Sequence, residues 1–257
     1  SENKAEDSLD FNWLAYSISQ TIGDHNWVKR LYEEAENKPC NVREMCDLAD
    51  SVFETLGDLN WVKKIYRSAE EKTNEYSDYS ELADSFHKNL DDKKKTQELY
   101  KKAESKAEVI SEFCSLAELI HKNFNNNKWA SSLYLKAEKK ARDSNDFCSL
   151  ADSLCENLRD KKWAKEIYNK AEKKLAHSHE ARWLAESIYK KLGEKELAKK
   201  IYNKAEEKAT LFYEFRRLAE SISEHLEDKE WANKIYKKAR EKARYRYDFD
   251  YLSKKQL

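Results

Sequence analysis

The cysteines and histidines of this chain have the side chains best suited to metal binding or nucleophilic catalysis, and three of them recur at a fixed spacing. His87, His121 and Cys155 follow one another with a period of 34, and Cys114 lies seven residues before His121. Seven residues are two turns of an α-helix, so Cys114 and His121 would share a helix face. If these side chains converged, they would hold a soft metal ion or form a cysteine–histidine nucleophile pair.

The spacing of these residues does not favour either chemistry. The closely spaced cysteine or histidine pairs of zinc sites are missing, and no third group is evident to orient a nucleophile. There is also no glycine-rich phosphate loop and no dinucleotide-binding fingerprint. We therefore expect no catalytic residue, no metal and no cofactor, and predict that the protein is not an enzyme. An odd number of cysteines in helical stretches predicts reduced thiols and a cytoplasmic location. The five are Cys40, Cys46, Cys114, Cys148 and Cys155.

A second polar set recurs with the same period and is mostly acidic. We call it the acidic ladder: six of its seven members are carboxylates, and a serine follows most of them. Three residues further along stands a mixed row that includes Phe53, His87, His121 and Tyr189. The ladder positions are Tyr16, Asp50, Asp84, Glu118, Asp152, Glu186 and Glu220.

The period of 34 governs the whole chain, without an insertion. Each period contains a tyrosine, an alanine three residues later, and in most cases a tryptophan five residues earlier. Such a register predicts one structural unit stacked on copies of itself. The repeated tyrosines are Tyr32, Tyr66, Tyr100, Tyr134, Tyr168, Tyr202 and Tyr236. The expected repeats are 8–41, 42–75, 76–109, 110–143, 144–177, 178–211 and 212–245, followed by a capping helix over 246–257.

Each repeat is predicted to hold two helices joined by a tight turn. The first helix carries a Leu-Ala pair, such as Leu48-Ala49, with apolar residues three and four positions apart on the same face. Gly23, Gly57 and Gly193 follow the first helices, where a left-handed residue ends a helix, whereas Arg159 and Glu227 suit that position less well. An aspartate comes next in five repeats and would cap the second helix. These are Asp24, Asp58, Asp92, Asp160 and Asp228.

Composition supports an all-α fold. Glycine and proline number only 3 and 1, and 38% of the residues are charged while the apolar residues stay periodic. Small alanines on both helices allow close packing, and a lone repeat could not bury both of its faces. We therefore predict one domain over residues 1–257, an α-solenoid of seven helix-turn-helix repeats with a C-terminal cap. No apolar run approaches the length that a membrane span requires.

The repeat resembles the tetratricopeptide repeat family over residues 8–257. The resemblance rests on the period of 34, the aromatic-x-x-Leu-small first helix, the Gly-Asp turn and the small-x-x-x-Tyr-x-x-Ala second helix, as in Ala198, Tyr202 and Ala205. The first helix carries Ala where the family usually has Gly, and the family's proline is present only as Pro39. The Ile-Tyr-x-x-Ala run is also similar to the half-tetratricopeptide repeats of RNA-processing factors.

The resemblance implies a right-handed superhelix whose first helices line a concave groove that holds a peptide or helix of a partner protein. The acidic ladder would then grip a basic peptide, or its carboxylates would instead pair with lysines of neighbouring repeats. The groove residues expected to bind a partner are Tyr16, Asp50, Phe53, Asp84, His87, Glu118, His121, Asp152, Glu186, Tyr189 and Glu220.

Charge distribution leaves two further alternatives. Residues 1–128 carry a net charge of −8 and residues 129–257 a net charge of +8, which would suit an oppositely charged partner or head-to-tail self-association. Lysines of the late second helices, with Arg240, Arg244, Arg246, Tyr245 and Tyr247, would let the last repeats contact RNA. Interspersed glutamates make nucleic acid the less favoured partner. A further alternative is an engineered or diversified repeat protein without a natural partner.

Overall fold

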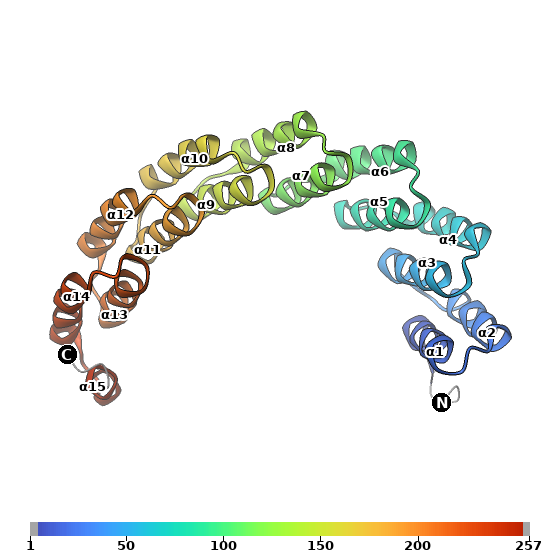
Figure 1. Ribbon diagram of the computed structural model, residues 1–257, viewed down its shortest axis with the longest axis horizontal. Coiled ribbons are helices and arrows are strands. Elements are labelled where there is room, and N and C mark those ends of the chain that lie inside the picture. Colours follow the sequence, from blue (N-terminus) through green and yellow to red (C-terminus); the bar gives the residue numbers. More distant parts are fainter. Residues whose placement is uncertain (1–4, 254–257) are drawn as a thin grey trace. The chain divides into compact units, whose positions relative to one another are not determined.

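The structure is a computed structural model that describes residues 5–253 (Figure 1). These residues form helices joined by short turns, with no strand among them. The chain divides into two compact units, Ser1–Asn126 and Asn127–Leu257. The division lies between two helices of the fourth sequence repeat, and the expectation of a single domain stays a prediction. Among residues 5–253, none of the helices has the combination of length and hydropathy needed for a membrane crossing.

The N-terminal unit is an array of helical hairpins. Within it the first three first helices, α1, α3 and α5, each pack against the second helix of their own repeat and against the first helix of the next repeat. Figure 1 shows the first helices of this unit in one layer and the second helices in the other. Its helices are α1 (Ser8–Thr21), α2 (His25–Glu36), α3 (Val42–Leu56), α4 (Leu59–Lys72), α5 (Tyr76–Leu90), α6 (Lys93–Lys106) and α7 (Ile110–Phe124).

The C-terminal unit repeats the same hairpin, with one difference at the ends of its first helices. There the last turn is a π-helix, labelled η2 (Leu154–Leu158), η3 (Ile188–Leu192) and η4 (Ile222–Leu226). The remaining helices are α8 (Asn127–Lys140), α9 (Ser144–Ser153), α10 (Lys161–Lys173), α11 (Ser178–Ser187), α12 (Lys195–Lys208), α13 (Phe212–Ser221), α14 (Lys229–Lys242) and α15 (Arg246–Ser253). The predicted capping helix thus begins at 246, and its expected end at 257 lies outside the described residues.

The turns have the predicted chemistry. A residue with positive φ follows every first helix of the seven repeats, at Gly23, Gly57 and Gly193 but also at Asp91, Asn125, Arg159 and Glu227. The five predicted aspartates all accept hydrogen bonds from backbone N–H groups at the start of the second helices. A left-handed residue followed at once by a cap explains how two helices are joined by so few residues.

The hydrophobic core of each unit lies between the two helix layers. The repeated tyrosines are at most 6% exposed, and the alanines three residues after them are fully buried, so the second helices approach their neighbours closely. The Leu-Ala pairs from Leu48-Ala49 onward are also buried. The last apolar position of the first helices is less covered than its spacing predicts, and Ile22 is 64% exposed. Phe249 of α15 is 46% exposed.

Candidate binding surface on the first helices

The acidic ladder lies on the first helices, and its carboxylates bond to the next repeat. Asp50 accepts hydrogen bonds from the Ser85 hydroxyl and, at 2.6 Å, from the amide nitrogen of Asn89. The hydroxyl of Tyr66 lies 2.7 Å from both the Ser85 Oγ and the Asn89 Nδ2. We call such a group, a ladder residue with the repeat tyrosine and the polar side chains of the following first helix, a junction. A junction ties two repeats together through polar atoms away from bulk water.

Asp84 forms the corresponding junction one repeat later in the N-terminal unit. Asn123 donates from Nδ2 to the Tyr100 hydroxyl at 2.8 Å and to Asp84 at 3.1 Å, and Tyr100 donates to Asp84 at 3.4 Å. At the preceding seam, Thr55 of α3 donates to the hydroxyl of Tyr32 at 3.1 Å. No carboxylate stands at position 16, whose tyrosine is 39% exposed.

The C-terminal unit contains the same arrangement with different side chains. Asp152 accepts from the Tyr168 hydroxyl at 2.5 Å and from the Ser187 hydroxyl at 3.0 Å. Glu186 accepts from the Ser221 hydroxyl at 2.5 Å and also from Arg182 of its own helix. Ladder carboxylates of both units, Asp50 and Asp84 in one and Asp152 and Glu186 in the other, are therefore used inside the array.

Two further contacts complete the ladder in the C-terminal unit. The hydroxyl of Tyr202 lies 3.2 Å from Nδ1 of His225, which stands where Asn89 stands in the N-terminal unit. Glu220 accepts from the hydroxyl of Tyr251 in α15. Different types of polar side chain thus make equivalent contacts between successive repeats.

Lysine pairing, the alternative expected from the sequence, is present at one ladder position. Lys88 of α5 lies 2.9 Å from Asp50 and 3.0 Å from Glu54, both on α3. Most of the ladder contacts instead come from hydroxyl and amide groups. Glu118 is the exposed carboxylate of the ladder, whereas the others are partly buried.

Burial raises the pKa of several ionisable side chains at the junctions. It raises the pKa of Asp152, although Tyr168 and Ser187 donate to this carboxylate. Burial, followed by the neighbouring charge of Asp152, raises the pKa of the Tyr168 hydroxyl as well. Burial likewise raises the pKa of Tyr66 and of Tyr100. Each of these tyrosines therefore keeps its proton and serves as a donor to its junction.

Residues of the mixed row beside the ladder pack against the following repeat. Phe53, His87, His121 and Tyr189 are all partly buried. The His87 ring lies 5.6 Å from the ring of Phe124, and the Tyr189 ring lies at the same distance from that of His225. These contacts make the row part of the inter-repeat packing.

The cysteines and histidines do not gather into a metal site in the described part of the chain. Among residues 5–253, there is no group of three or more His, Cys, Asp and Glu side chains arranged to hold a metal ion. Burial raises the pKa of Cys155, and it raises that of Cys148 to about 12. A raised pKa disfavours the thiolate, which is the nucleophilic and metal-binding form of cysteine.

The structure reveals an exposed row that the sequence prediction missed. It consists of the residue immediately before each Leu-Ala pair, and every member is exposed. The signal was present in the sequence, because this position varies in charge and size while the adjacent Leu-Ala does not vary. The members of the exposed row are Trp13, Asp47, Glu81, Ser115, Ser149, Trp183 and Arg217.

In the N-terminal unit the exposed row contributes to an acidic patch on α3 and α5. We define this acidic patch as Asp47 and Glu54 on α3 and Glu81 on α5, all of them exposed. Burial and nearby carboxylates, opposed by Arg43 and Lys88, raise the pKa of Asp47. Glu54 pairs with Lys88 at 3.0 Å, and Glu81 lies 4.0 Å from Arg43, with all four side chains exposed. Exposed ion pairs of this kind are weak, and Asp47 has no such partner among the described residues, so the patch keeps a negative potential.

A different surface lies where α15 begins. The rings of Tyr245 and Tyr247 are stacked, with centroids 5.5 Å apart, and the two residues are 61% and 67% exposed. Lys242 and Arg244 line the same depression, which has a volume of about 500 Å³. Comparison of the chain with protein-family models and with curated proteins gives no match. A function must therefore be inferred from these surfaces.

Proposed function

We propose that the protein is a non-enzymatic scaffold, tetratricopeptide-like in its repeat, that binds a segment of a partner protein on the surface formed by its first helices. The observation that carries this proposal is the contrast between the buried Leu-Ala pairs and the exposed row beside them. A row needed only for solubility would stay polar throughout, whereas this one includes Trp13 and Trp183 at 72% and 44% exposure. Exposed aromatic and charged residues at repeating positions suit recognition of a partner.

The acidic patch indicates which kind of partner segment the N-terminal unit would bind. Asp47, Glu54 and Glu81 favour a segment rich in lysine or arginine, because charge complementarity speeds association and excludes wrong partners. The ladder carboxylates Asp50 and Asp84 already accept hydrogen bonds from neighbouring repeats. They contribute to the negative potential rather than to direct contacts.

The test is a binding measurement with basic peptides. The tightest ligand from an array of lysine- and arginine-rich peptides is labelled, and its dissociation constant is measured by fluorescence anisotropy. The triple variant Asp47→Asn, Glu54→Gln, Glu81→Gln should bind it at least about tenfold more weakly. A matched control removes three exposed charges from the second helices of the same unit, Glu33→Gln, Glu34→Gln and Glu71→Gln. Equal affinities for the two variants would refute the acidic patch as the site.

The stacked tyrosines favour a second candidate function, binding of single-stranded RNA. Exposed aromatic rings next to basic side chains are the common platform on which unpaired bases stack. Tyr245 and Tyr247 stand beside Lys242, Arg244 and Arg246 in this way. The double variant Tyr245→Ala, Tyr247→Ala should weaken binding of a labelled oligouridine, and the affinity should fall with added salt. Absence of salt-sensitive binding by the parent chain would remove this candidate.

A further inference from the structure

A cavity of about 600 Å³ lies inside the N-terminal unit. It is lined by α4 and α6, the second helices of two successive repeats, and by α5, the first helix between them in the chain. All of its lining residues lie between Leu59 and Leu99. Neither the exposed row nor the acidic patch contributes to it, so it is separate from the surface proposed to bind a partner.

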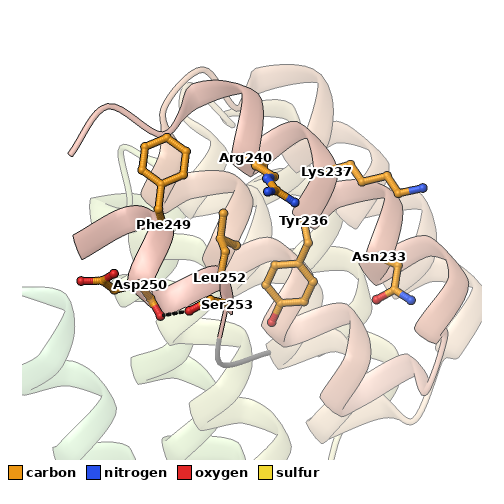
Figure 2. Close-up of a pocket in the computed structure, with 8 residues that line it drawn as sticks. All are labelled: Asn233, Tyr236, Lys237, Arg240, Phe249, Asp250, Leu252 and Ser253. Carbon is orange, nitrogen blue, oxygen red and sulfur yellow. Dashed lines mark hydrogen bonds between the residues drawn. The ribbon is translucent and has the colours of Figure 1, made fainter. Parts of the chain in front are cut away.

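The same face of a second helix lines a cavity at α14 and α15, which Figure 2 shows. There Tyr236 and Lys237 stand where Tyr66 and Arg67 stand in α4. The described residues end at 253 and include no second helix after α15. The cavity in the N-terminal unit, in contrast, has the following second helix, α6, as one of its walls. Its opening therefore does not depend on where the described residues end.

The cavity lies where a second helix lacks its tryptophan. In the C-terminal unit, the ring of Trp231 packs edge-on against that of Tyr202, with centroids 6.5 Å apart, and two other repeat tyrosines have the same contact. Beside Tyr66 the tryptophan is replaced by Lys95, whose ammonium group lies 2.8 Å from Glu70. A lysine side chain lacks the width of an indole, so the space that a ring fills in those repeats stays open here.

Phe86 shows the effect of this opening. It lines the cavity and is partly exposed, whereas the residues at its position in the other repeats are at most 5% exposed. Its ring lies 5.1 Å from that of Tyr66. The two rings give the cavity an aromatic side, against which a planar apolar group would be removed from water. The equivalent residues are Ile18, Val52, Ile120, Leu154, Ile188 and Ile222.

One buried polar atom in the lining has no partner. Asn89 is 5% exposed, and its amide nitrogen donates to Asp50 and to the hydroxyl of Tyr66. Because an ionised carboxylate can only accept, the contact with Asp50 fixes which end of the amide is the nitrogen. The other end, Oδ1 of Asn89, accepts no hydrogen bond from any group among residues 5–253. A ligand that offers an N–H would be favoured here, since an unpaired buried oxygen is costly.

The charges that line the cavity favour an anion. Glu70 already bonds to Lys95, and Asp92 accepts from the backbone at the start of α6. Lys63 and Arg67 of α4 are exposed and form no ion pair within the described part of the chain. These two basic side chains are therefore available for an acidic group of a ligand.

We propose that the cavity between α4, α5 and α6 binds a small planar aromatic acid that carries an N–H donor, of which an indole carboxylate is the simplest example. The ring packs on Phe86 and Tyr66, and the N–H donates to Oδ1 of Asn89. The carboxylate pairs with Lys63 or Arg67. The ligand thus supplies the ring that a tryptophan supplies in other repeats.

The test is isothermal titration calorimetry of the full chain with indole-3-propionate. One molecule should bind per chain. Tryptamine, which carries an ammonium group on the same ring system, should bind at least about tenfold more weakly. The benzofuran analogue of the acid, which lacks the N–H, should bind at least about fivefold more weakly. Failure of the parent chain to bind indole-3-propionate, or an equal affinity for either analogue, would overturn the proposal.

Filling the cavity provides a matched pair of variants. Lys95→Trp restores the indole of the other repeats and should abolish binding of indole-3-propionate without lowering the melting temperature. The control Lys94→Trp removes the same charge and adds the same side chain at the exposed neighbouring position, and should leave the affinity unchanged. The double variant Lys63→Gln, Arg67→Gln should lose the preference for the acid over tryptamine. Undiminished binding by Lys95→Trp, or an unchanged preference in the double variant, would overturn the proposal as well.

Discussion

The hydroxyl oxygen of Tyr66 lies 2.7 Å from the side-chain nitrogen of Asn89, a residue of the following repeat. Tyr100 and Asn123 repeat this relationship at 2.8 Å, and Tyr134 and Asn157 at 3.1 Å. The bond therefore recurs in both units. It joins the second helix of one repeat to the first helix of the next.

Replacing Tyr66 by Phe should lower the free energy of unfolding by about 1–2 kcal/mol, because the buried side chains of Ser85 and Asn89 would lose a hydrogen-bond partner. Urea denaturation followed by circular dichroism measures this change. Tyr247→Phe is the control, since Tyr247 is 67% exposed and its substitution should alter stability by less than about 0.5 kcal/mol. A Tyr66→Phe protein as stable as the parent would show that the junction hydroxyl is not needed for stability.

Ionised Glu70 should stabilise the N-terminal unit at neutral pH, and this stabilisation should be lost in acid. Burial opposes ionisation of this carboxyl, but hydrogen bonds from Lys95 and Lys102 outweigh it, so its pKa is below the ordinary 4.5. A depressed pKa in the folded state stabilises the protein above pH 4.5, and this contribution is lost as the pH falls through the folded-state pKa. Glu70→Gln should therefore cost about 0.5–1 kcal/mol at pH 7 and nothing in strong acid.

Thermal unfolding from pH 2 to pH 7 tests this difference. The curves of parent and Glu70→Gln should converge as the pH is lowered and separate as it is raised. Glu71→Gln, at the exposed neighbouring position, should follow the parent throughout. A constant gap between parent and Glu70→Gln at every pH would contradict the assignment to ionisation of Glu70.

Arg159 and Glu227 occupy left-handed backbone conformations, with φ values of 55° and 57°. Glycine adopts this conformation without steric cost, so Arg159→Gly and Glu227→Gly should each stabilise the C-terminal unit by about 1 kcal/mol. Differential scanning calorimetry measures the rise in melting temperature. At Gly193, where a Cβ would meet nothing within 4 Å, Gly193→Ala should destabilise the unit through backbone strain alone. Unchanged melting temperatures in all three variants would contradict this prediction and show that the turns adjust their backbone without a cost in stability.

The helical hairpins were predictable because the residues that specify each hairpin lie within a single repeat. Tyr66 and Ala69 recur with a constant phase, and Asp58 stands where a cap is needed, so each hairpin follows from spacing within a single period. Even Arg159, an unfavourable residue for that conformation, adopts the left-handed backbone that its position predicts. Neighbouring periods agree so closely that one exception does not alter the fold.

The role of the acidic ladder could not be predicted in the same way. Asp50 contacts Ser85 and Asn89, which lie 35 and 39 residues further along, and only the stacking of two repeats brings them together. A periodic acidic residue has the same sequence signal whether it faces a ligand or a neighbouring repeat.

The recurrence of the junction has a consequence for how the protein's length can change. Asp152 accepts from Tyr168 and from Ser187 of the next first helix. Glu186 accepts from Ser221 in the same way, and the Tyr202 hydroxyl lies beside His225. Deletion of residues 178–211 would place Ser221 opposite Asp152 and leave a compatible polar contact. Within the C-terminal unit, a gene segment encoding one whole period could therefore be removed while the two repeats brought together keep a polar contact.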